Sequence, residues 1–570
     1  MQQLIDELNP SQREVALLRR HCVAVAVPGA GKTKTIATKA ALLLANENAR
    51  VGAVTFSKDA AVELRDRILA LAGPGAKKRL LAGTFHSLAF KQLGSGGKRP
   101  GIASDGDRLA LVAQVLDETG VEWRVDDAVA AIERAKTGMD APPAGTPEAL
   151  LFEAYQDALA RNGKIDFQDM LRLAVAGMQR GTIKPYPFTE LLVDEFQDTD
   201  TIQSRWIALH AAAGAVVSLV ADDDQSIYGW RDAGGYKSIE AFIREFDATP
   251  VVLGQNYRCR AEILAAADKV IQCNKDRIPK ELVAARGPGG SVAFQRFDDE
   301  YAEAVSAVEA LSAVLRAGKT AAVLARTNRI LDPIEAVCRS HGVRYYRASG
   351  RSILDRPEGA LMGNLLELIQ KSKSGGLDAL LGFAGIGGHE LRLIHSKIGR
   401  SMDQRQKRDL IEMGLSELSA DRYRELLKRL LEWRGLCDRH LYALVLDGVH
   451  EWMMLFARSD AAKRSIRTTY DVLSRLSGPF SERLEFLRRD NNEPAEDALV
   501  LTTMHSAKGL EWSSVQIIRA EETVIPDEKS TESEERRLFY VAMTRARDQL
   551  HISTARKNPT SRFVQEADLA

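Results

Sequence analysis

Residues 191–198 read Leu191-Leu192-Val193-Asp194-Glu195-Phe196-Gln197-Asp198, three apolar residues followed by two adjacent carboxylates. The apolar run predicts a short buried strand, and a parallel α/β sheet presents its ligand-binding groups at the carboxyl ends of strands. Asp194 can then hold Mg²⁺, and Glu195 can orient or deprotonate a water. The same residues also fit a strand that ends in a solvated turn. The functional interpretation therefore requires a phosphate site elsewhere in the chain.

A phosphate-binding loop is predicted at Pro28-Gly29-Ala30-Gly31-Lys32-Thr33, after the apolar run 23–27 and before a helix-forming stretch. Glycines let backbone N–H groups turn toward phosphate oxygens, Lys32 reaches the β- and γ-phosphates, and the Thr33 hydroxyl coordinates Mg²⁺. Ala26 stands where the usual pattern has its first glycine. With the two carboxylates, this loop predicts hydrolysis of a nucleoside triphosphate.

Length and composition limit the classes of protein to consider. A chain of 570 residues predicts three or four domains, and 45% hydrophobic with 27% charged residues is typical of globular proteins. No apolar run approaches the roughly 20 residues of a membrane helix, and the start lacks the pattern of a signal peptide. Five scattered cysteines without C-x-x-C spacing predict buried thiols in a reducing compartment, and we expect a cytoplasmic location. Basic and acidic residues are equal in number, so net charge gives no support for nucleic-acid binding.

Strand-like runs alternate with helical stretches, which predicts two α/β units with parallel sheets. The predicted strands are residues 23–27, 51–56, 191–193, 215–220, 321–325, 500–503 and 514–518. Two mainly helical regions, about 91–185 and 376–490, interrupt these units. The first unit is thus expected at 1–90 and 186–255, and the second at 256–375 and 491–570.

Other polar and aromatic residues can couple hydrolysis to a second partner. Gln225 can sense a γ-phosphate, and the arginines Arg258 and Arg545 can stabilise charge on a transferring phosphate. Tyr228 and Trp230 are aromatics two residues apart, which either stack on nucleic-acid bases or pack in a core.

Gln12 follows Leu8-Asn9-Pro10-Ser11 near the start of the chain and also has two interpretations. Its amide can read an adenine edge with a paired donor and acceptor. The alternative is a purely structural helix start, with Ser11 as the N-cap.

Motifs along nearly the whole chain resemble, in order, those of the UvrD/Rep/PcrA family of superfamily 1 DNA helicases. Besides Gln12 and the phosphate-binding loop, the matching stretches are 55–58 with 60–61, 83–87, 193–199, 222–233, 256–258, 325–326, 503–511 and 535–545. The most specific are Met504-His505-Ser506-Ala507-Lys508-Gly509-Leu510-Glu511 and Tyr540-Val541-Ala542-Met543-Thr544-Arg545-Ala546. The resemblance implies two RecA-like parallel-sheet motor domains, each with a helical insertion.

The resemblance also implies roles for individual residues, with ATP and Mg²⁺ as cofactors. The implied hydrolysis residues are Lys32, Asp194, Glu195, Gln225, Arg258 and Arg545, the two arginines coming from the second motor domain; Thr33 and Asp194 would hold the metal. The implied ATP contacts are Gln12, Pro28, Gly29, Ala30, Gly31, Lys32, Thr33, Lys34, Tyr257, Arg258, Glu511 and Arg545, with Tyr257 stacking on adenine and Glu511 binding ribose. The implied single-stranded DNA contacts are Phe56, His86, Tyr228, Trp230 and His505.

The sequence departs from the family pattern at a few positions: Ala26, Lys34, Ala221, Asp232 and Trp512. Lys34 replaces an arginine and lacks its planar fork. The second insertion is short for the family.

By resemblance, we expect an ATP-dependent DNA helicase that moves 3′ to 5′ on single strands, binds single-stranded and tailed double-stranded DNA, and acts in repair, replication or recombination. The alternative is a DNA-stimulated ATPase or translocase subunit of a nuclease or phage-defence complex that unwinds weakly alone. A catalytically silent DNA-binding subunit is a third class, which the intact hydrolysis residues disfavour.

Overall fold

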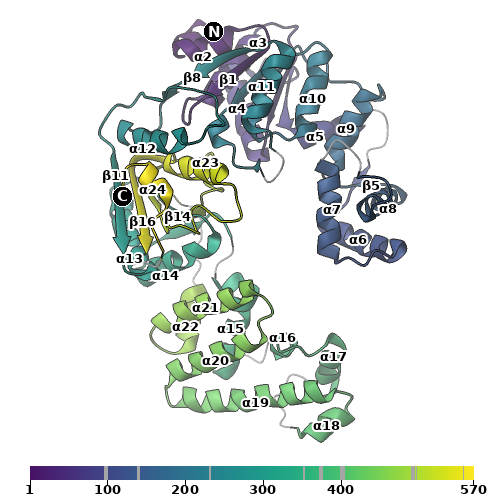
Figure 1. Cartoon of the computed structure of the whole chain (residues 1–570), viewed down its shortest axis with the longest axis vertical. Coiled ribbons are helices and arrows are strands. Elements are labelled where there is room, and N and C mark those ends of the chain that lie inside the picture. Colours follow the sequence, from purple (N-terminus) through teal and green to yellow (C-terminus); the bar gives the residue numbers. More distant parts are fainter. Residues whose placement is uncertain are drawn as a thin grey trace. The chain divides into compact units, whose positions relative to one another are not determined.

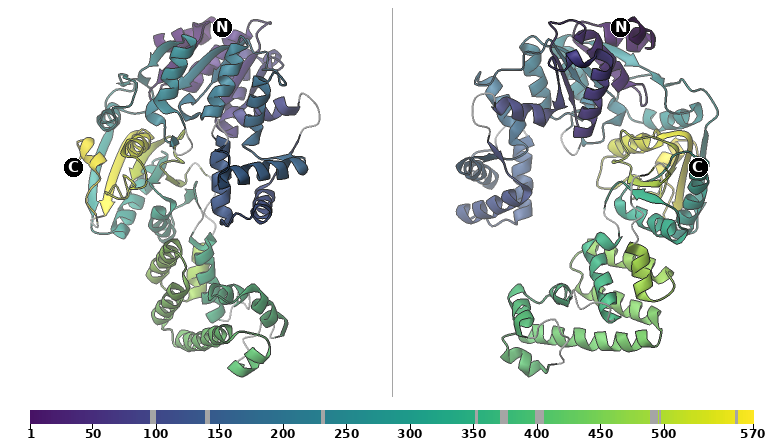
Figure 2. Two further views of the ribbon diagram at one scale, coloured as in Figure 1. Left: turned by 45° about the vertical axis from the view of Figure 1, so that its right-hand side comes forward. Right: turned by 180° about the vertical axis from the view of Figure 1, so that it is seen from behind.

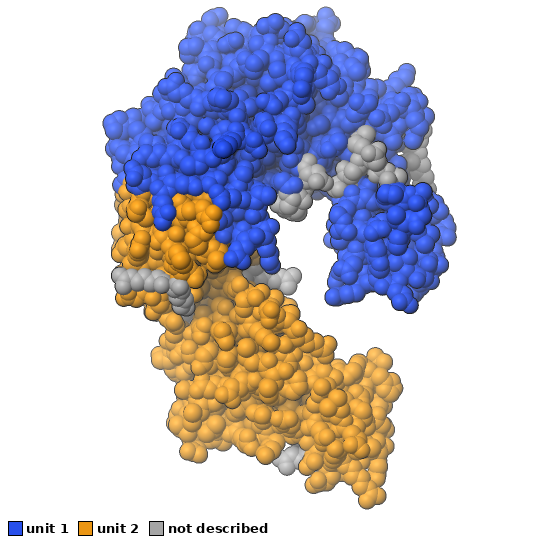
Figure 3. Space-filling model, viewed as in Figure 1, with its two compact units in different colours: residues 1–291, 526–548, 565–568 blue, residues 292–525, 549–564, 569–570 orange. Residues whose placement is uncertain are grey.

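The computed structural model describes residues 1–94, 100–137, 142–229, 233–350, 353–370, 377–397, 405–488, 495, 497–555 and 558–570. The chain divides into two compact units (Figure 3): unit 1 is residues 1–291, 526–548 and 565–568, and unit 2 is the remainder. Each unit carries a six-stranded sheet with helices (Figure 1, Figure 2). The predicted α/β fold with two parallel-sheet domains is confirmed. In the described ranges, no helix has the length and apolar character needed to cross a membrane.

The sheet of unit 1 has the strand order β3-β2-β6-β7-β1-β8, and all neighbouring strands are parallel. Its strands are β1 (Cys22–Ala26), β2 (Val51–Thr55), β3 (Leu80–Thr84), β6 (Glu190–Val193), β7 (Val216–Ala221) and β8 (Thr249–Leu253). Four of them match predicted runs. The two edge strands, β3 and β8, are not among the predicted runs; β8 contains Pro250, which only an edge strand tolerates well.

Both faces of this sheet are buried, which explains the continuous apolar run that ends in the two carboxylates. Successive side chains of a strand point to opposite faces. Leu191 and Val193 accordingly pack in one core cluster with Trp206 of α10, whereas Leu192 packs in another with Ile36 of α3. Helices therefore cover both faces, the arrangement expected of a parallel sheet.

The helices of unit 1 fall into two groups, those outside and those inside the predicted helical insertion. The first group is α1 (Gln2–Asp6), α2 (Pro10–Leu17), α3 (Lys32–Leu44), α4 (Lys58–Ala72), α5 (Phe85–Leu93), α10 (Thr201–Ala212), α11 (Gly235–Phe246), α12 (Ala261–Gln272) and α23 (Glu532–Met543). Within 91–185 lie α6 (Asp105–Thr119), α7 (Val125–Thr137), α8 (Pro147–Arg161) and α9 (Asp169–Gln179), with short strands β4 (Gly101–Ile102) and β5 (Lys164–Ile165). Helices α6, α7 and α8 share a core of their own.

Unit 2 is built on the strand order β11-β16-β15-β12-β14-β13. Its strands are β11 (Ser291–Phe297), β12 (Ala321–Ala325), β13 (Tyr345–Arg347), β14 (Leu499–Thr503), β15 (Trp512–Ile517) and β16 (Ala546–Ala555), of which β12, β14 and β15 match predicted runs. Strand β12 pairs in parallel with both β14 and β15. Helices α13 (Glu300–Arg316) and α14 (Asp332–Ser340) pack on this sheet.

A second helical region of unit 2 has its own large apolar core. Its helices are α15 (Pro357–Ile369), α16 (Leu377–Phe383), α17 (Gly388–Lys397), α18 (Lys407–Glu412), α19 (Glu417–Asp438), α20 (Tyr442–Phe456), α21 (Asp460–Arg475) and α22 (Phe480–Arg488); α24 (Arg562–Glu566) lies near the C-terminus. The expected boundaries at 375/376 and 490/491 fall outside the described residues. The compact division groups 256–291 and 526–548 with the first sheet, and the predicted domain boundaries stay a prediction.

Two smaller predictions are corrected by the structure. The helix before the phosphate loop begins at Pro10 with Asn9 as its N-cap, so Ser11 is not the cap. All five cysteines are free, as expected, but Cys273 is exposed while the other four are buried.

The helical core of unit 2 makes a direct stability prediction. Leu366 of α15 is fully buried, whereas Leu444 of α20 is 54% exposed. We expect Leu366→Ala to lower the opening free energy of α15–α22 by about 2–5 kcal/mol, because it leaves a cavity. Leu444→Ala should change it by less than about 0.5 kcal/mol. Hydrogen-exchange mass spectrometry of these helices measures both, and equal effects would contradict the assigned core.

Candidate active site

The candidate site lies at the carboxyl edge of the first sheet. Strand β7 lies between β6 and β1, so the loops that follow these three strands begin at adjacent positions. The loops carry residues 27–31, Asp194 with Glu195, and residues 222–225. Sequence reasoning recognised each loop, and the strand order explains how they form one site.

The loop after β1 has a backbone that only glycine accommodates easily. Gly29 and Gly31 have φ of 64° and 73°. A Cβ at Gly29 would lie 2.7 Å from Arg258 Cβ, and one at Gly31 would lie 2.9 Å from Gln12 Nε2. Helix α3 begins at Lys32, so the amides of its first turn have no intrahelical acceptor and face the same region. These features are those of an anion-binding loop.

Lys32 and Glu195 form a bidentate ion pair across this site. The Lys32 ammonium lies 2.8 Å from Glu195 Oε1 and 2.9 Å from Oε2. Burial disfavours the charged lysine, but Glu195, Asp222 and Asp194 outweigh burial and raise the pKa of Lys32. Glu195 has φ of 55°, an uncommon backbone conformation for a residue with a side chain. This strained conformation brings the Glu195 carboxylate to the Lys32 ammonium.

Asp194 is buried, and its surroundings disfavour the ionised carboxylate. Its backbone N–H donates to Val54 O at 2.9 Å, and its Oδ1 accepts from Glu195 N at 3.0 Å. Burial, and then the charge of Glu195, raise the pKa of Asp194 to about 6, while Lys32 and the Thr33 hydroxyl oppose this shift. A divalent cation beside Asp194 and Thr33 would favour the carboxylate form.

Gln197 connects the two acidic loops. Its Nε2 donates to Glu195 Oε2 at 2.5 Å, and its Oε1 accepts from Asp222 N at 2.9 Å. Asp222 in turn accepts from Gln225 Nε2 at 2.5 Å. The chain of contacts reaches Arg545, whose guanidinium donates to Gln225 Oε1 at 3.2 Å.

The two predicted arginines lie close together within unit 1. Arg258 donates to Thr544 O at 3.3 Å, and Arg545 donates to Val541 O at 2.8 Å. Arg545 is 1% exposed. Burial, and then the charge of Arg258, lower the pKa of Arg545 to about 9. Two neighbouring guanidiniums, one of them buried, form a strongly cationic position beside Gln225.

The predicted adenine contacts also lie together. Gln12 is the third residue of α2, where its side chain completes a capping box with Asn9 and donates to Ala30 O at 2.9 Å. Asn9 donates to the Tyr257 hydroxyl at 2.8 Å, and Tyr257 N donates to Gly29 O at 2.9 Å. Gln12 is therefore both a capping residue and a neighbour of the phosphate loop.

Two other predicted nucleotide contacts have different surroundings. Lys34 points to Glu7, donating to its backbone oxygen at 3.0 Å. Glu511 is exposed and lies in unit 2.

Four of the predicted DNA contacts lie within the described residues. Phe56, 39% exposed, stacks on Tyr228 with ring centroids 5.6 Å apart and planes at 10°. His86 is partly exposed, and burial lowers its pKa to about 4, so it is neutral at physiological pH. His505 lies after β14 in unit 2. Trp230, like the departure at Asp232, falls outside the described residues.

Phe167 is an aromatic residue that the sequence predictions do not include. It stacks on His86 with ring centroids 4.1 Å apart and planes at 19°, yet it remains 54% exposed. Residues 166–169, which include Phe167, are held by buried Lys136, which pairs with Asp166 at 2.6 Å and with Asp169 at 2.7 Å. The sequence pattern from which Phe167 could have been predicted is an aromatic residue between acidic residues, Asp166-Phe167-Gln168-Asp169.

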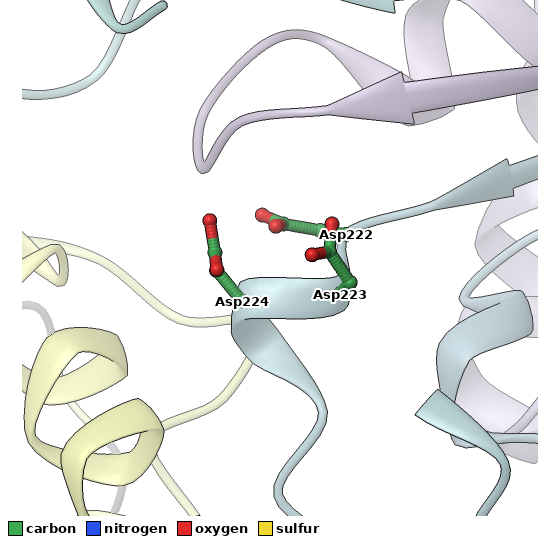
Figure 4. Close-up of side chains that lie close together, drawn as sticks. All are labelled: Asp222, Asp223 and Asp224. Atoms are coloured by element: carbon green, nitrogen blue, oxygen red, sulfur yellow. The ribbon is translucent and has the colours of Figure 1, made fainter. Parts of the chain in front are cut away.

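Three consecutive carboxylates, Asp222, Asp223 and Asp224, gather where β7 ends (Figure 4), and one oxygen of each lies within 4.8 Å of one oxygen of the other two. Lys280 contacts all three, and Arg277 binds Asp224 through two hydrogen bonds. Protein cations therefore already neutralise this cluster. Neither basic residue is in a motif singled out by sequence, because both come from the segment after α12.

Comparisons with known proteins identify the family that the chain resembles. The model of the UvrD/REP helicase N-terminal domain matches residues 8–247, and that of the UvrD-like helicase C-terminal domain matches residues 251–432 and 480–557. The ATP-dependent DNA helicase PcrA of Bacillus subtilis is 28% identical, with 99% of this chain and 86% of the relative covered. DNA helicase II of Escherichia coli is 29% identical, covering 97% and 85%.

The raised pKa of Asp194 predicts a pH-dependent stability change. The pKa is about 6 in the folded protein and about 3.9 in an unfolded chain. Ionised Asp194 therefore destabilises the fold above about pH 4, and the cost grows until about pH 6 and is constant beyond it. We expect Asp194→Asn to raise the free energy of unfolding by about 1–3 kcal/mol at pH 7.5, a gain that shrinks as the pH falls from 6 to 4.

Urea unfolding at several pH values measures this gain. Asp105→Asn is the control, since Asp105 has a 97% exposed side chain in the first turn of α6. A stability loss for Asp194→Asn at pH 7.5 would contradict the destabilisation that we attribute to ionised Asp194.

Proposed function

This chain belongs to the UvrD-like DNA helicase family, and from that membership we propose that it is an ATP-dependent helicase moving 3′ to 5′ on single-stranded DNA. Hydrolysis of Mg²⁺-bound ATP would drive strand separation in repair, replication or recombination. The observation that carries the proposal is the unbroken series of contacts from Lys32 through Glu195, Gln197 and Gln225 to Arg545. The direction of movement and the pathway are inferred from the family.

The residues present fit an ATP phosphate chain. The glycine loop leaves no room for a Cβ at Gly29 or Gly31 and directs a helix start toward the same place. Lys32 is held by Glu195 in this arrangement. On nucleotide binding, Lys32 would exchange this carboxylate for phosphate oxygens, which leaves Glu195 as the acceptor for a proton from the attacking water. Gln197 would keep Glu195 oriented during the exchange.

Thr33 and Asp194 fit Mg²⁺, because their side chains are hydrogen-bonded to each other and the carboxylate is poorly stabilised without a cation. Bound Mg²⁺ would neutralise charge on the phosphates and act as a Lewis acid. Gln12 and Tyr257 would contact adenine, with Lys34 at the nucleotide's edge and Glu511 on the ribose.

Arg258 and Arg545 would stabilise charge on the transferring phosphate. The family resemblance assigns both to the second motor domain, although the compact division groups them with unit 1; on the family assignment, hydrolysis would depend on closure of the two motor domains. The lowered pKa of Arg545 reflects burial beside another guanidinium. A phosphate anion between the two arginines would relieve that repulsion, which makes this position selective for the nucleotide-bound state.

Aromatic pairs would form the DNA track. Phe56 with Tyr228, and His86 with the additional residue Phe167, present two stacked pairs with exposed ring surface. Stacking of bases on aromatic rings contributes about 1–3 kcal/mol per base without sequence preference. Neutral His86 would act by stacking and hydrogen bonding. Trp230 and His505 are further proposed contacts.

The second candidate function is a DNA-stimulated ATPase or translocase subunit with a nuclease or repair partner. The alignment to the Bacillus subtilis relative runs over 642 residues, against 570 in this chain. The relative thus has segments without a counterpart here, which favours a reduced motor that depends on a partner for unwinding.

Strand-separation and ATPase assays test the two functions. We expect single-stranded DNA to stimulate hydrolysis and the protein to unwind duplexes with a 3′ tail. Unwinding from 5′ tails alone would overturn the direction. Stimulated hydrolysis without unwinding of either substrate would select the second candidate, and absence of hydrolysis would refute both.

Lys32→Ala tests the assignment of the hydrolysis site. Loss of the ammonium should lower the hydrolysis rate by at least about 100-fold. Affinity for single-stranded DNA, measured by fluorescence anisotropy, should stay measurable because the aromatic pairs are unaltered. Lys34→Ala is the matched control, since Lys34 pairs with Glu7; we expect a smaller loss. Turnover of Lys32→Ala at the wild-type rate would refute the site.

A further inference from the structure

Lys280 is a buried lysine that the proposed mechanism does not use. Its side chain has no exposed surface, and its ammonium contacts Asp222 Oδ1 at 3.5 Å, Asp224 Oδ2 at 2.9 Å and Asp223 Oδ1. It lies in the segment between α12 and β10 (Val283–Ala284). One lysine ammonium therefore contacts all three carboxylates of the cluster.

The neighbouring residues fix the same segment to the acidic loop. Arg277 donates to both oxygens of Asp224, at 2.9 and 2.7 Å, and Ile278 N donates to Asp223 Oδ2 at 2.7 Å. Buried carboxylates are costly unless they are paired and hydrogen-bonded. Residues 277–280 meet that requirement, so they determine the conformation of the short helix η4 (Asp223–Gln225).

Asp222 joins this ion cluster to the hydrolysis site. One of its oxygens faces Lys280, and the other accepts from Gln225 Nε2 at 2.5 Å. Its backbone N–H is held by Gln197, and Gln225 accepts from Arg545. The orientation of the Gln225 amide thus depends on Asp222, whose buried Oδ1 accepts no hydrogen bond from the described residues and lies 3.5 Å from the Lys280 ammonium.

We propose that Lys280 is a positioning residue for ATP hydrolysis, acting as the internal cation that holds Asp222 so that Asp222 orients Gln225. The inference rests on the proposed function, because it assumes that Gln225 senses the γ-phosphate. Lys280 does not contact the phosphate loop, so its effect falls on the hydrolysis step rather than on nucleotide affinity.

The test is a set of variants in the full chain assayed for DNA-stimulated hydrolysis. Lys280→Met should lower kcat roughly 10- to 100-fold, because small misplacements of reacting groups have effects of this size. The KM for ATP and the affinity for a fluorescent ATP analogue should stay within about threefold of wild type. Lys275→Met should leave kcat within about threefold, since Lys275 is an exposed lysine of the same segment.

A double-mutant cycle identifies the route of the effect. If Lys280 acts through Asp222, then Asp222→Asn with Lys280→Met should lose no more kcat than the worse single variant. Additive losses, an unchanged kcat for Lys280→Met, or a loss of nucleotide affinity alone would each overturn the inference.

A second variant covers the case in which Lys280→Met does not fold. Lys280→Met with Asp223→Asn removes one cation and one anion, so the charge balance of the cluster is kept. Its kcat should remain reduced, and wild-type kcat in this variant would overturn the inference. Wild-type protein assayed in parallel distinguishes failure of the inference about Lys280 from failure of the proposed function. Absence of hydrolysis in the wild-type protein would refute the proposed function itself.

Discussion

The adjacency of three parallel strands is the constraint on which the site depends. Because β7 lies between β6 and β1, loops separated by up to about two hundred residues of sequence emerge side by side at one edge of the sheet. Both faces of the sheet are buried by helices, so the strand order cannot change without exposing apolar surface. The packing of the core therefore decides where the phosphate loop meets the carboxylates.

The site concentrates charge that the fold tolerates only through pairing. Asp194 has a pKa raised to about 6, Glu195 has a left-handed backbone, and Arg545 has a pKa lowered to about 9. Each is a local cost that packing elsewhere offsets, and such costs concentrate at functional sites. Lys32 limits the cost by pairing with Glu195 at one end of the series of contacts, and Lys280 does so by pairing with Asp222 and its two neighbours. Loss of either lysine would leave unpaired charge in a water-poor position.

A shared side chain connects the ionic part of the site to its aromatic part. Gln197 bonds to the Glu195 carboxylate and to the backbone of Asp222, and the chain then runs from Gln225 to the aromatic residue Tyr228 within three residues. A displacement near the phosphate loop can therefore be transmitted to the Phe56–Tyr228 stack through bonded neighbours. This connection supports the proposal that nucleotide hydrolysis is coupled to DNA contacts.

The sequence by itself determined the α/β class, the phosphate loop, the paired carboxylates and the family, because each depends on contiguous residues whose spacing reflects a local strand, turn or helix start. Two short segments are enough to predict the phosphate loop and the paired carboxylates, namely Pro28 to Thr33 and Leu191 to Glu195. Only the tertiary structure decided that Gln12 donates to Ala30 of the phosphate loop, that Phe167 stacks on His86, and that Lys280 contacts Asp222, Asp223 and Asp224. Each of these contacts joins segments that are distant in sequence. Strand order and side-chain burial bring such segments together, and neither leaves a local pattern in the sequence.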